Sequence, residues 1–334
     1  MDHDTLLDRL TVFARARTSD RDAAVRDLRA MPGHAGFSWG FTVVTRTGDE
    51  PLVLRLPPPG VRYVGNADIM RQSRIVAALG GTPVPVAPVR WFGEAEHWFG
   101  RPYLIVDFLP GRTLTPADPG IDHALDAPLL ERIARETART LATLHGLDWT
   151  HTLPELGPPV SLEEEVQKCD YLLERTADPE LVRSAPALKV RLLATLPLNP
   201  RAGIVHGDFQ WSNLLYRPDG SVVAVIDWEL AGIGATLIDL GWLLVFSDLE
   251  SWAGLGRWSL PLPAPEAISA LYEDALGTAV PEVRWYRAFA GYKFGLIAGF
   301  NLMLHRRGKR VDPLYEDFVP SISRLLERGL DVIG

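Results

Sequence analysis

Apolar residues near the start of the chain are spaced as in a helix, and short apolar runs follow further along. Leu6, Leu10 and Phe13 lie on one stripe, and Val25 and Leu28 lie on a second. We therefore expect one or two amphipathic helices over residues 5–30. A later helix over 68–79 is expected to begin at its N-cap Asp68 and to stop at two glycines. The apolar runs predict strands over residues 41–45, 51–56, 89–92 and 103–108.

Beyond residue 108 the pattern is mainly helical. Asp126 and Pro128 are a start signal for a helix that continues through His145. His145 is then near the C-terminus of this helix, where its imidazole would interact favourably with the helix dipole. Ser161 and Glu164 form a capping box for a helix to about residue 175. Further helices are expected over 181–196, 235–244 and 284–305.

One stretch combines strand signals with polar residues at the strand ends. The apolar pair Ile204-Val205 leads to Asp208 and Asn213, and the β-branched run 222–226 ends at Asp227. Pro218-Asp219-Gly220 between them is a turn sequence. The pattern predicts strand, tight loop, strand, turn and strand, which can bring the three polar side chains together.

These residue types suit phosphoryl transfer. That reaction needs positioning and charge neutralisation rather than covalent help from the protein. One carboxylate must orient the attacking hydroxyl, and Mg²⁺ prefers hard oxygen ligands such as an amide and a second carboxylate. Asp208 is the candidate for the first role, and Asn213 with Asp227 for the second.

The sequence His206-Gly207-Asp208, four residues, Asn213, followed by Ile226-Asp227-Trp228-Glu229, resembles the aminoglycoside phosphotransferase-like kinases. Among these it is most similar to the branch of small-molecule phosphotransferases and of the phosphotransferase domains fused to some acyl-CoA dehydrogenases. The resemblance implies an α+β, two-lobed protein-kinase-like fold. The N-lobe, with its antiparallel sheet and N-terminal helices, would span residues 1–108, and the mainly helical C-lobe residues 109–334.

The resemblance also implies nucleotide-binding residues in the N-lobe. Arg55, just before Pro58-Pro59-Gly60, stands where kinases carry the lysine that pairs the phosphates. Ser38, in the glycine-rich stretch 32–40, would contact the phosphates, although a plain glycine turn is the alternative. Gln72 stands where the family carries the glutamate that holds the strand cation, so an amide would orient Arg55.

Two further roles are carried over by position. Backbone groups of Asp107, Phe108 and Leu109, before the Pro110-Gly111 stop, would bind adenine. His206 and Asp239 would support the catalytic loop, Asp239 by accepting hydrogen bonds from the loop backbone. A simple cap at the start of a helix is the alternative for Asp239.

Composition limits the kinds of partner. The net charge is −8 over 334 residues, which does not favour nucleic acid or an anionic membrane surface. Cys169 is the only cysteine, so we expect a reducing, cytoplasmic location. The start lacks the apolar stretch of a signal peptide, and the sequence has no run of eighteen apolar residues.

The expected function is ATP- or GTP-dependent, Mg²⁺-requiring phosphorylation of a hydroxyl of a small molecule. The alternative is a weak or inactive nucleotide-binding scaffold of the same fold. A protein kinase is disfavoured because no long activation segment follows Asp227. The acceptor and the oligomeric state stay open. A cationic acceptor would need converging carboxylates from among Glu163–Glu165, Glu229 and Asp248, and a hydroxyacyl acceptor would need cations such as Lys168, Lys293 or the run 306–310.

Overall fold

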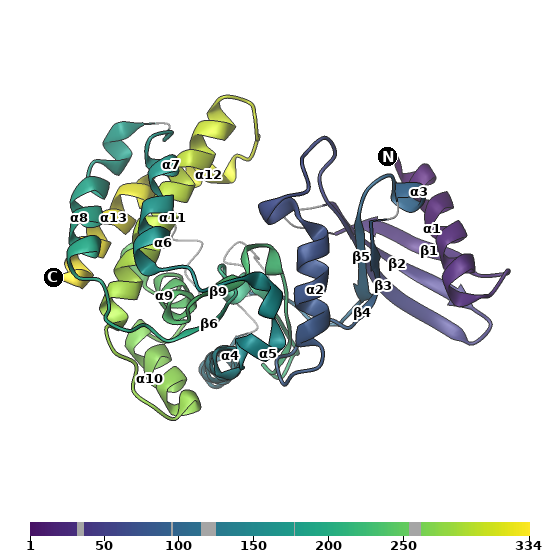
Figure 1. Cartoon of the computed structure of the whole chain (residues 1–334), viewed down its shortest axis with the longest axis horizontal. Helices are drawn as coiled ribbons and strands as arrows, with labels where there is room; N and C mark the ends of the chain where they lie inside the picture. Colours follow the sequence, from purple (N-terminus) through teal and green to yellow (C-terminus); the bar gives the residue numbers. More distant parts are fainter. Residues whose placement is uncertain (32–36, 95, 115–124, 177, 254–261) are drawn as a thin grey trace. The chain divides into compact units, whose positions relative to one another are not determined.

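The chain divides into two compact units in a computed structural model (Figure 1). Unit 1 comprises Met1–Gly111 and Val223–Ala231, and unit 2 comprises Arg112–Val222 and Gly232–Gly334. The structure describes residues 1–334 except 32–36, 95, 115–124, 177 and 254–261. The first boundary lies at Gly111 rather than at residue 108, and the segment that carries Asp227 belongs with unit 1.

Unit 1 is built on a five-stranded antiparallel sheet in the order β1-β2-β3-β5-β4. On β3, alternate residues Leu52, Leu54 and Leu56 are buried in one core with residues of helix α1, whereas Arg55 lies on the opposite face. The sheet therefore has one face covered by α1 and one face that carries polar chemistry. The strands are β1 (Ala24–Ala30), β2 (Phe37–Thr45), β3 (Gly48–Leu56), β4 (Val89–Gly93) and β5 (Tyr103–Asp107).

The expectation of N-terminal helices over residues 5–30 was half wrong. Helix α1 (His3–Thr18) ends before Ser19, which adopts a left-handed backbone, and the next element is strand β1. Val25 and Leu28 both pack against the core although they are three residues apart, a helical spacing. The cause is a bulge in β1: its register shifts between Arg26 and Arg29, and Asp27 adopts φ 56°. The extra residue brings two side chains of odd spacing to one face.

Helix α2 (Ile69–Leu79) forms as predicted in unit 1. The Asp68 carboxylate caps it by accepting a hydrogen bond from the Arg71 N–H at 2.9 Å. Ile69, Ile75, Val76 and Leu79 are buried. A short helix, α3 (Glu96–Phe99), precedes β5.

Unit 2 is mainly helical and contains a two-stranded antiparallel sheet of β6 (Ala202–Val205) and β9 (Gly232–Ala235). Strand β7 (Leu214–Tyr216) leads to a turn closed by a hydrogen bond from the Arg217 N–H to the Ser221 carbonyl. The strand that follows, β8 (Val222–Val225), belongs to unit 1 from Val223 onward. The helices are α4 (Ala127–Gly146), α5 (Trp149–Thr152), α6 (Leu162–Lys168), α7 (Asp170–Leu173), α8 (Ala185–Ala194), α9 (Leu237–Val245), α10 (Pro265–Leu276), α11 (Val283–Arg306), α12 (Leu314–Asp317) and α13 (Val319–Ile333).

Most predicted helices of unit 2 are present with small differences. The Ser161–Glu164 capping box begins α6, but the helix expected to reach residue 175 is divided at Cys169 into α6 and α7. The helix expected over 181–196 is α8, preceded by a 3₁₀ turn over Pro179–Val182. In the described ranges, none of the helices is long and apolar enough to cross a membrane.

Gly241 allows close packing of α9 against α11. A Cβ atom at this position would lie 2.3 Å from the carbonyl oxygen of Tyr286. Helix α9 is buried along its length and carries the charged residue Asp239 inward. The close approach of the two helices therefore determines where Asp239 lies.

Candidate active site

The loop of unit 2 that carries Asp208 follows directly from strand β6. Asp239 on α9 is fully buried, and its carboxylate accepts hydrogen bonds from the N–H groups of His206 (2.6 Å) and Gly207 (2.8 Å). Gly207 has φ 87°, a conformation that glycine adopts without steric cost. A buried carboxylate needs such donors, and here the donors are the backbone of the loop that presents Asp208. Asp239 thus holds the loop in place, as the resemblance implied.

A buried histidine completes this support. Nε2 of His145 lies 3.4 Å from Oδ2 of Asp239, and Nδ1 lies 2.7 Å from the Tyr272 hydroxyl. Burial lowers the pKa of His145, and the Asp239 carboxylate only partly opposes this, which favours the neutral imidazole. The expected contact of His145 with the helix dipole missed this role, because Asp239 is 94 residues away along the chain.

The Asp208 side chain is held by three donors. Trp242 Nε1 and Gln210 Nε2 donate to Oδ1 at 2.7 and 2.8 Å, and Asn213 Nδ2 donates to Oδ2 at 2.8 Å. Burial raises the pKa of Asp208, while the neighbouring His206 and the three hydrogen bonds act in the opposite direction. A raised pKa in a fixed carboxylate suits a group that accepts a proton during turnover. The sequence pattern did not indicate Trp242 or Gln210.

Asn213 and His206 have distinct places in the loop. The amide nitrogen of Asn213 is bound to Asp208, through both its carboxylate and its backbone carbonyl at 2.8 Å. The amide oxygen is then the atom that Asn213 can offer to a cation. His206 is fully buried and its Nδ1 accepts a hydrogen bond from the Asp208 N–H at 3.2 Å. That contact fits the structural role predicted for His206.

Unit 1 carries the predicted cation and the second carboxylate. Nη2 of Arg55 lies 2.8 Å from Oδ1 of Asp227 and 3.8 Å from Oε2 of Glu229. Asp227 adopts the left-handed conformation (φ 67°, ψ 59°), which is unusual outside glycine and is found at functional turns. Ser38 lies directly opposite Arg55 in the β2–β3 register, so both residues are on one face of the sheet.

The other predicted nucleotide residues are also in unit 1. The N–H groups of Asp107 and Phe108 already donate to the carbonyls of Pro88 and Pro51, at 2.9 and 3.0 Å. Adenine recognition by this segment would therefore depend on the Leu109 N–H and on carbonyl groups. Ser38 is in strand β2 rather than in a turn, and residues 32–36 of the predicted glycine-rich turn lie outside the described residues.

Gln72 is buried but does not contact Arg55 through any hydrogen bond seen here. Its Nε2 donates to the Asn66 carbonyl at 2.8 Å, and its Oε1 has no hydrogen-bond partner within the described ranges of the chain. The predicted role of Gln72 as the group that orients Arg55 stays a prediction without a contact to support it.

Two of the predicted site residues each offer an oxygen atom of a kind that can bind a magnesium ion. Asn213 offers an amide oxygen in unit 2, and Asp227 offers a carboxylate in unit 1. Both are hard oxygen ligands of the kind Mg²⁺ prefers, and the protein commonly supplies few of them because phosphate and water complete the shell.

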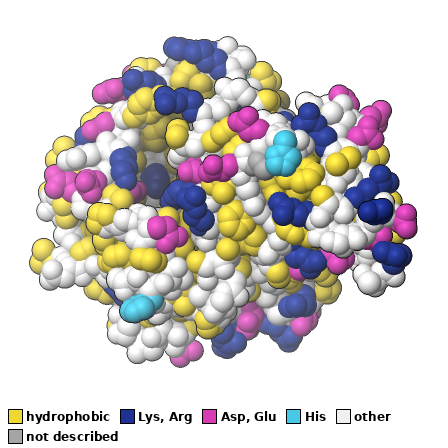
Figure 2. Space-filling view, turned by 45° about the vertical axis from the view of Figure 1, so that its right-hand side comes forward, with side chains coloured by type: hydrophobic (Ala, Val, Ile, Leu, Met, Phe, Trp, Pro, Cys, Tyr) yellow, Lys and Arg dark blue, Asp and Glu magenta, His cyan; other side chains and the backbone are white. Residues whose placement is uncertain are grey.

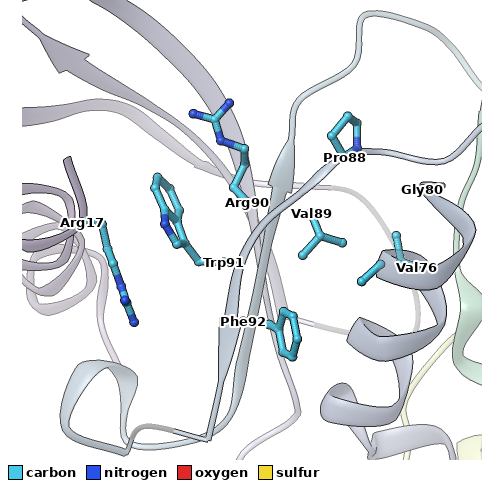
Figure 3. Close-up of a pocket in the computed structure, with 9 residues that line it drawn as sticks. Arg17, Val76, Gly80, Pro88, Val89, Arg90, Trp91 and Phe92 are labelled. Atoms are coloured by element: carbon cyan, nitrogen blue, oxygen red, sulfur yellow. The ribbon is translucent and has the colours of Figure 1, made fainter. Parts of the chain in front are cut away.

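A cavity of about 530 Å³ in unit 1 lies elsewhere (Figure 3). It is lined by Arg17 near the end of α1, by Val76 of α2 and Gly80 just after that helix, and by Pro88 with the edge strand β4 that follows it. None of the predicted site residues lines it. The cavity therefore gives no support to the predicted site, which rests on the chemistry of the loop residues.

Comparison with models of protein families identifies the family of this chain. A model of the phosphotransferase enzyme family matches residues 35–289, which contain Arg55, Asp208, Asn213, Asp227 and Asp239. The chain belongs to the phosphotransferase enzyme family.

Individual relatives agree with this membership. Acyl-CoA dehydrogenase family member 10 of Mus musculus is 26% identical over 282 residues, which cover 80% of this chain and 25% of that protein. The chain spans only a quarter to a third of the length of such curated relatives. The whole relatives are therefore much longer than the region they share with this chain.

Solved structures establish the fold. The crystal structure of a proposed aminoglycoside phosphotransferase from Ralstonia eutropha superposes with a TM-score of 0.79 at 24% identity, covering 98% of this chain and 97% of that one. Aminoglycoside phosphotransferase APH(4)-Ia, in a ternary complex with AMP-PNP and hygromycin B, gives a TM-score of 0.61 at 17% identity, covering 96% and 98%. The predicted α+β, protein-kinase-like fold is confirmed.

Proposed function

We propose that this phosphotransferase is a kinase that uses ATP or GTP to phosphorylate a hydroxyl group of a small molecule. The hydroxyl oxygen attacks the γ-phosphorus, the bond from that phosphorus to the bridging oxygen breaks, and the nucleoside diphosphate leaves. Asp208 accepts the hydroxyl proton. The observation that carries the proposal is the half-buried Asp208 carboxylate, which is fixed by Trp242, Gln210 and Asn213.

The remaining residues have supporting roles in this proposal. Asn213 and Asp227 hold Mg²⁺, which supplies charge neutralisation at the phosphates when bound. Arg55, with Ser38 beside it on the sheet, binds the phosphates. The segment Asp107–Leu109 binds the nucleobase. The AMP-PNP complex of a structural neighbour supports a nucleotide co-substrate.

The charges of unit 2 bear on the acceptor. Glu165 pairs with Lys168 at 2.7 Å and with Lys293 at 3.5 Å. Asp248 pairs with Arg287 and Arg328, each at 3.0 Å. A polycationic acceptor would have to displace these internal partners, at a cost in desolvation and lost pairing. The pairing supports an acceptor with few positive charges rather than an aminoglycoside.

The distribution of surface charge bears on the kind of partner. Figure 2 shows Lys and Arg side chains interspersed with Asp and Glu side chains over the face that it presents. With a net charge of −8, this distribution supports a small-molecule partner rather than nucleic acid. The cytoplasmic location predicted from the single cysteine, which is buried, stays a prediction.

The test is a transfer assay with γ-labelled ATP and GTP in the presence of Mg²⁺. Sugars, amino alcohols, hydroxy acids, macrolides and aminoglycosides are screened, and Asp208→Asn serves as the inactive control. Labelled product formed by the wild type and not by Asp208→Asn supports the kinase. Nucleotide binding with no transfer and no Asp208-dependent hydrolysis would favour the scaffold alternative.

A further inference from the structure

Helix α2 supplies no carboxylate to Arg55. Its sequence from Ile69 to Leu79 contains no Asp or Glu, and the Asp68 carboxylate is used as the N-cap. Gln72, only 3% exposed, donates to the Asn66 carbonyl, and its Oε1 has no hydrogen-bond partner in the described part of the chain. Protein kinases hold the corresponding cation with a helix glutamate. The charge that fixes Arg55 here must come from another element.

The segment after Asp227 supplies that charge. Oε2 of Glu229 lies 3.8 Å from Nη2 of Arg55, and both side chains are largely buried, at 19% and 22% exposure. A neighbouring arginine of α2 holds this segment in turn: Arg71 donates to the Glu229 carbonyl at 3.5 Å and to the Ala231 carbonyl. Helix α2 therefore fixes the backbone that carries Glu229, although it offers no acidic side chain of its own.

Asp227 and Glu229 are not equivalent partners of Arg55. Asp227 makes the shorter contact, at 2.8 Å, but the proposed function assigns its carboxylate to Mg²⁺. Glu229 is then the carboxylate that still pairs with Arg55 when Mg²⁺ and nucleotide are bound. We propose that Glu229 is the positioning residue for Arg55 and takes the place of the helix glutamate. This inference rests on the proposed nucleotide site.

The proposal explains why an amide is tolerated at residue 72. A glutamate at Gln72 would place a carboxylate against the Asn66 carbonyl, where the amide nitrogen now donates a hydrogen bond. Two acceptors facing one another in a buried place are unfavourable. The negative charge that pairs with Arg55 therefore lies on the segment after Asp227 and not on α2, while Arg55 itself is on β3.

The test is the sign of the change in nucleotide affinity. Glu229→Gln removes a negative charge, which by charge alone would tighten the binding of anionic ATP. A positioning role predicts the opposite: about ten-fold weaker ATP binding by calorimetry in EDTA, because Arg55 is no longer held. That factor corresponds to about 1.4 kcal/mol. Glu229→Asp keeps the charge with a shorter reach and is expected to be intermediate. Glu96→Gln, the same change at an exposed residue of α3, is the control.

A double-variant comparison shows whether Glu229 acts through Arg55. Arg55→Met weakens ATP binding, and Arg55→Met with Glu229→Gln is expected to bind no worse than Arg55→Met alone. Additive losses, tighter binding by Glu229→Gln, or a loss seen only when Mg²⁺ is present would overturn the proposal. The last result would make Glu229 a metal ligand instead.

Failure of the nucleotide site itself has a different outcome. If the wild type binds neither ATP nor GTP, the proposed function fails. Thermal unfolding of the wild type, Arg55→Met, Glu229→Gln and the double variant still tests the pairing. Coupled changes in Tm from Arg55→Met and Glu229→Gln would show that Glu229 holds Arg55. Additive changes in Tm would reject the positioning role on their own.

Discussion

The indole Nε1 of Trp242 donates a 2.7 Å hydrogen bond to Oδ1 of Asp208. Trp242 is on α9, three residues after Asp239, so one helix fixes both the loop backbone and the carboxylate of the proposed base. Its ring is packed against Phe294 and Phe246. Lys293 Nζ lies 5.9 Å from the ring centroid. A side chain so enclosed has little freedom, and it presents its one donor to Asp208.

Trp242→Phe is expected to change the pH dependence of turnover. Burial raises the pKa of Asp208, and the Trp242 hydrogen bond opposes this rise by stabilising the ionised form. Loss of the donor raises the pKa further. Because the base must be ionised to accept a proton, the acid limb of the kcat/KM profile moves to higher pH, by about one unit for a hydrogen bond to a charged group.

Trp252→Phe is the matched control for that measurement. Trp252 belongs to the same aromatic cluster, but its Nε1 donates to the Val245 carbonyl at 2.9 Å. Its replacement is expected to leave the acid limb in place. Equal shifts from both variants, or none from Trp242→Phe, would show that the Trp242 hydrogen bond does not tune Asp208.

Asp208→Asn is expected to lower the rate of transfer by a factor of about 10² to 10⁴, the range for removing a general base. Nucleotide affinity should change little, because Asp208 has no assigned contact with the nucleotide. Single-turnover transfer and calorimetric ATP binding are the two measurements. A parallel loss of ATP binding and of the folded state would mean that Asp208 is structural.

Gly241→Ala is expected to destabilise the fold and to impair the site together. The added Cβ would lie 2.3 Å from the Tyr286 carbonyl oxygen, so α9 must move away from α11. Overpacking of this kind costs roughly 1–3 kcal/mol, and here it displaces the helix that carries Asp239 and Trp242. Denaturant unfolding and transfer rate are measured. Gly146→Ala, where nothing lies within 4 Å of the new Cβ, should be nearly neutral.

Asp248 is expected to contribute stability that depends on pH. Burial acts to raise its pKa, but the hydrogen bond and charge of Arg328 and the charge of Arg287 outweigh this, so the pKa lies below 3.8. The contribution is therefore present above pH 3.8 and is lost as the pH falls through the lower, folded-state pKa.

Asp248→Asn removes this contribution, and the two half-buried arginines keep only their contacts with Glu266 and Glu250. The expected loss at pH 7 is about 2 kcal/mol, within the range for hydrogen bonds to charged groups. The difference from wild type should shrink as the pH falls below 3.8, since the wild type then loses the same contribution. Asp274→Asn, on the exposed side of α10, is the control for unfolding at both pH values. A loss that does not depend on pH would contradict the assignment.

The local parts of the site were predictable, and the long-range parts were not. Asp208, Asn213 and Asp227 are marked by strand ends, a turn sequence and a fixed spacing, all within one stretch of chain. Trp242 and His145 contact Asp208 and Asp239 across 34 and 94 residues, and nothing in their own neighbourhoods indicates a polar partner. Glu229 was visible in the sequence. Its pairing with Arg55 depends on a fold that brings Arg55 next to Asp227, which lies 172 positions later in the chain.

The fold shows the same division. Helices α2 and α4 have clear start signals, α11 has a long apolar pattern, and all three formed close to the expected bounds. Strand β1 was mistaken for a helix because a bulge at Asp27 makes its apolar spacing look helical. Periodicity identifies an element only while its backbone stays regular.

The measurement that tests the central claim most directly is calorimetric binding of ATP and GTP, with and without Mg²⁺, to the wild type and to Asp227→Ala. The account predicts tight binding of at least one nucleotide that depends on Mg²⁺, and loss of that metal dependence in Asp227→Ala. Binding of neither nucleotide to the wild type, or equal Mg²⁺ dependence in both proteins, would contradict it.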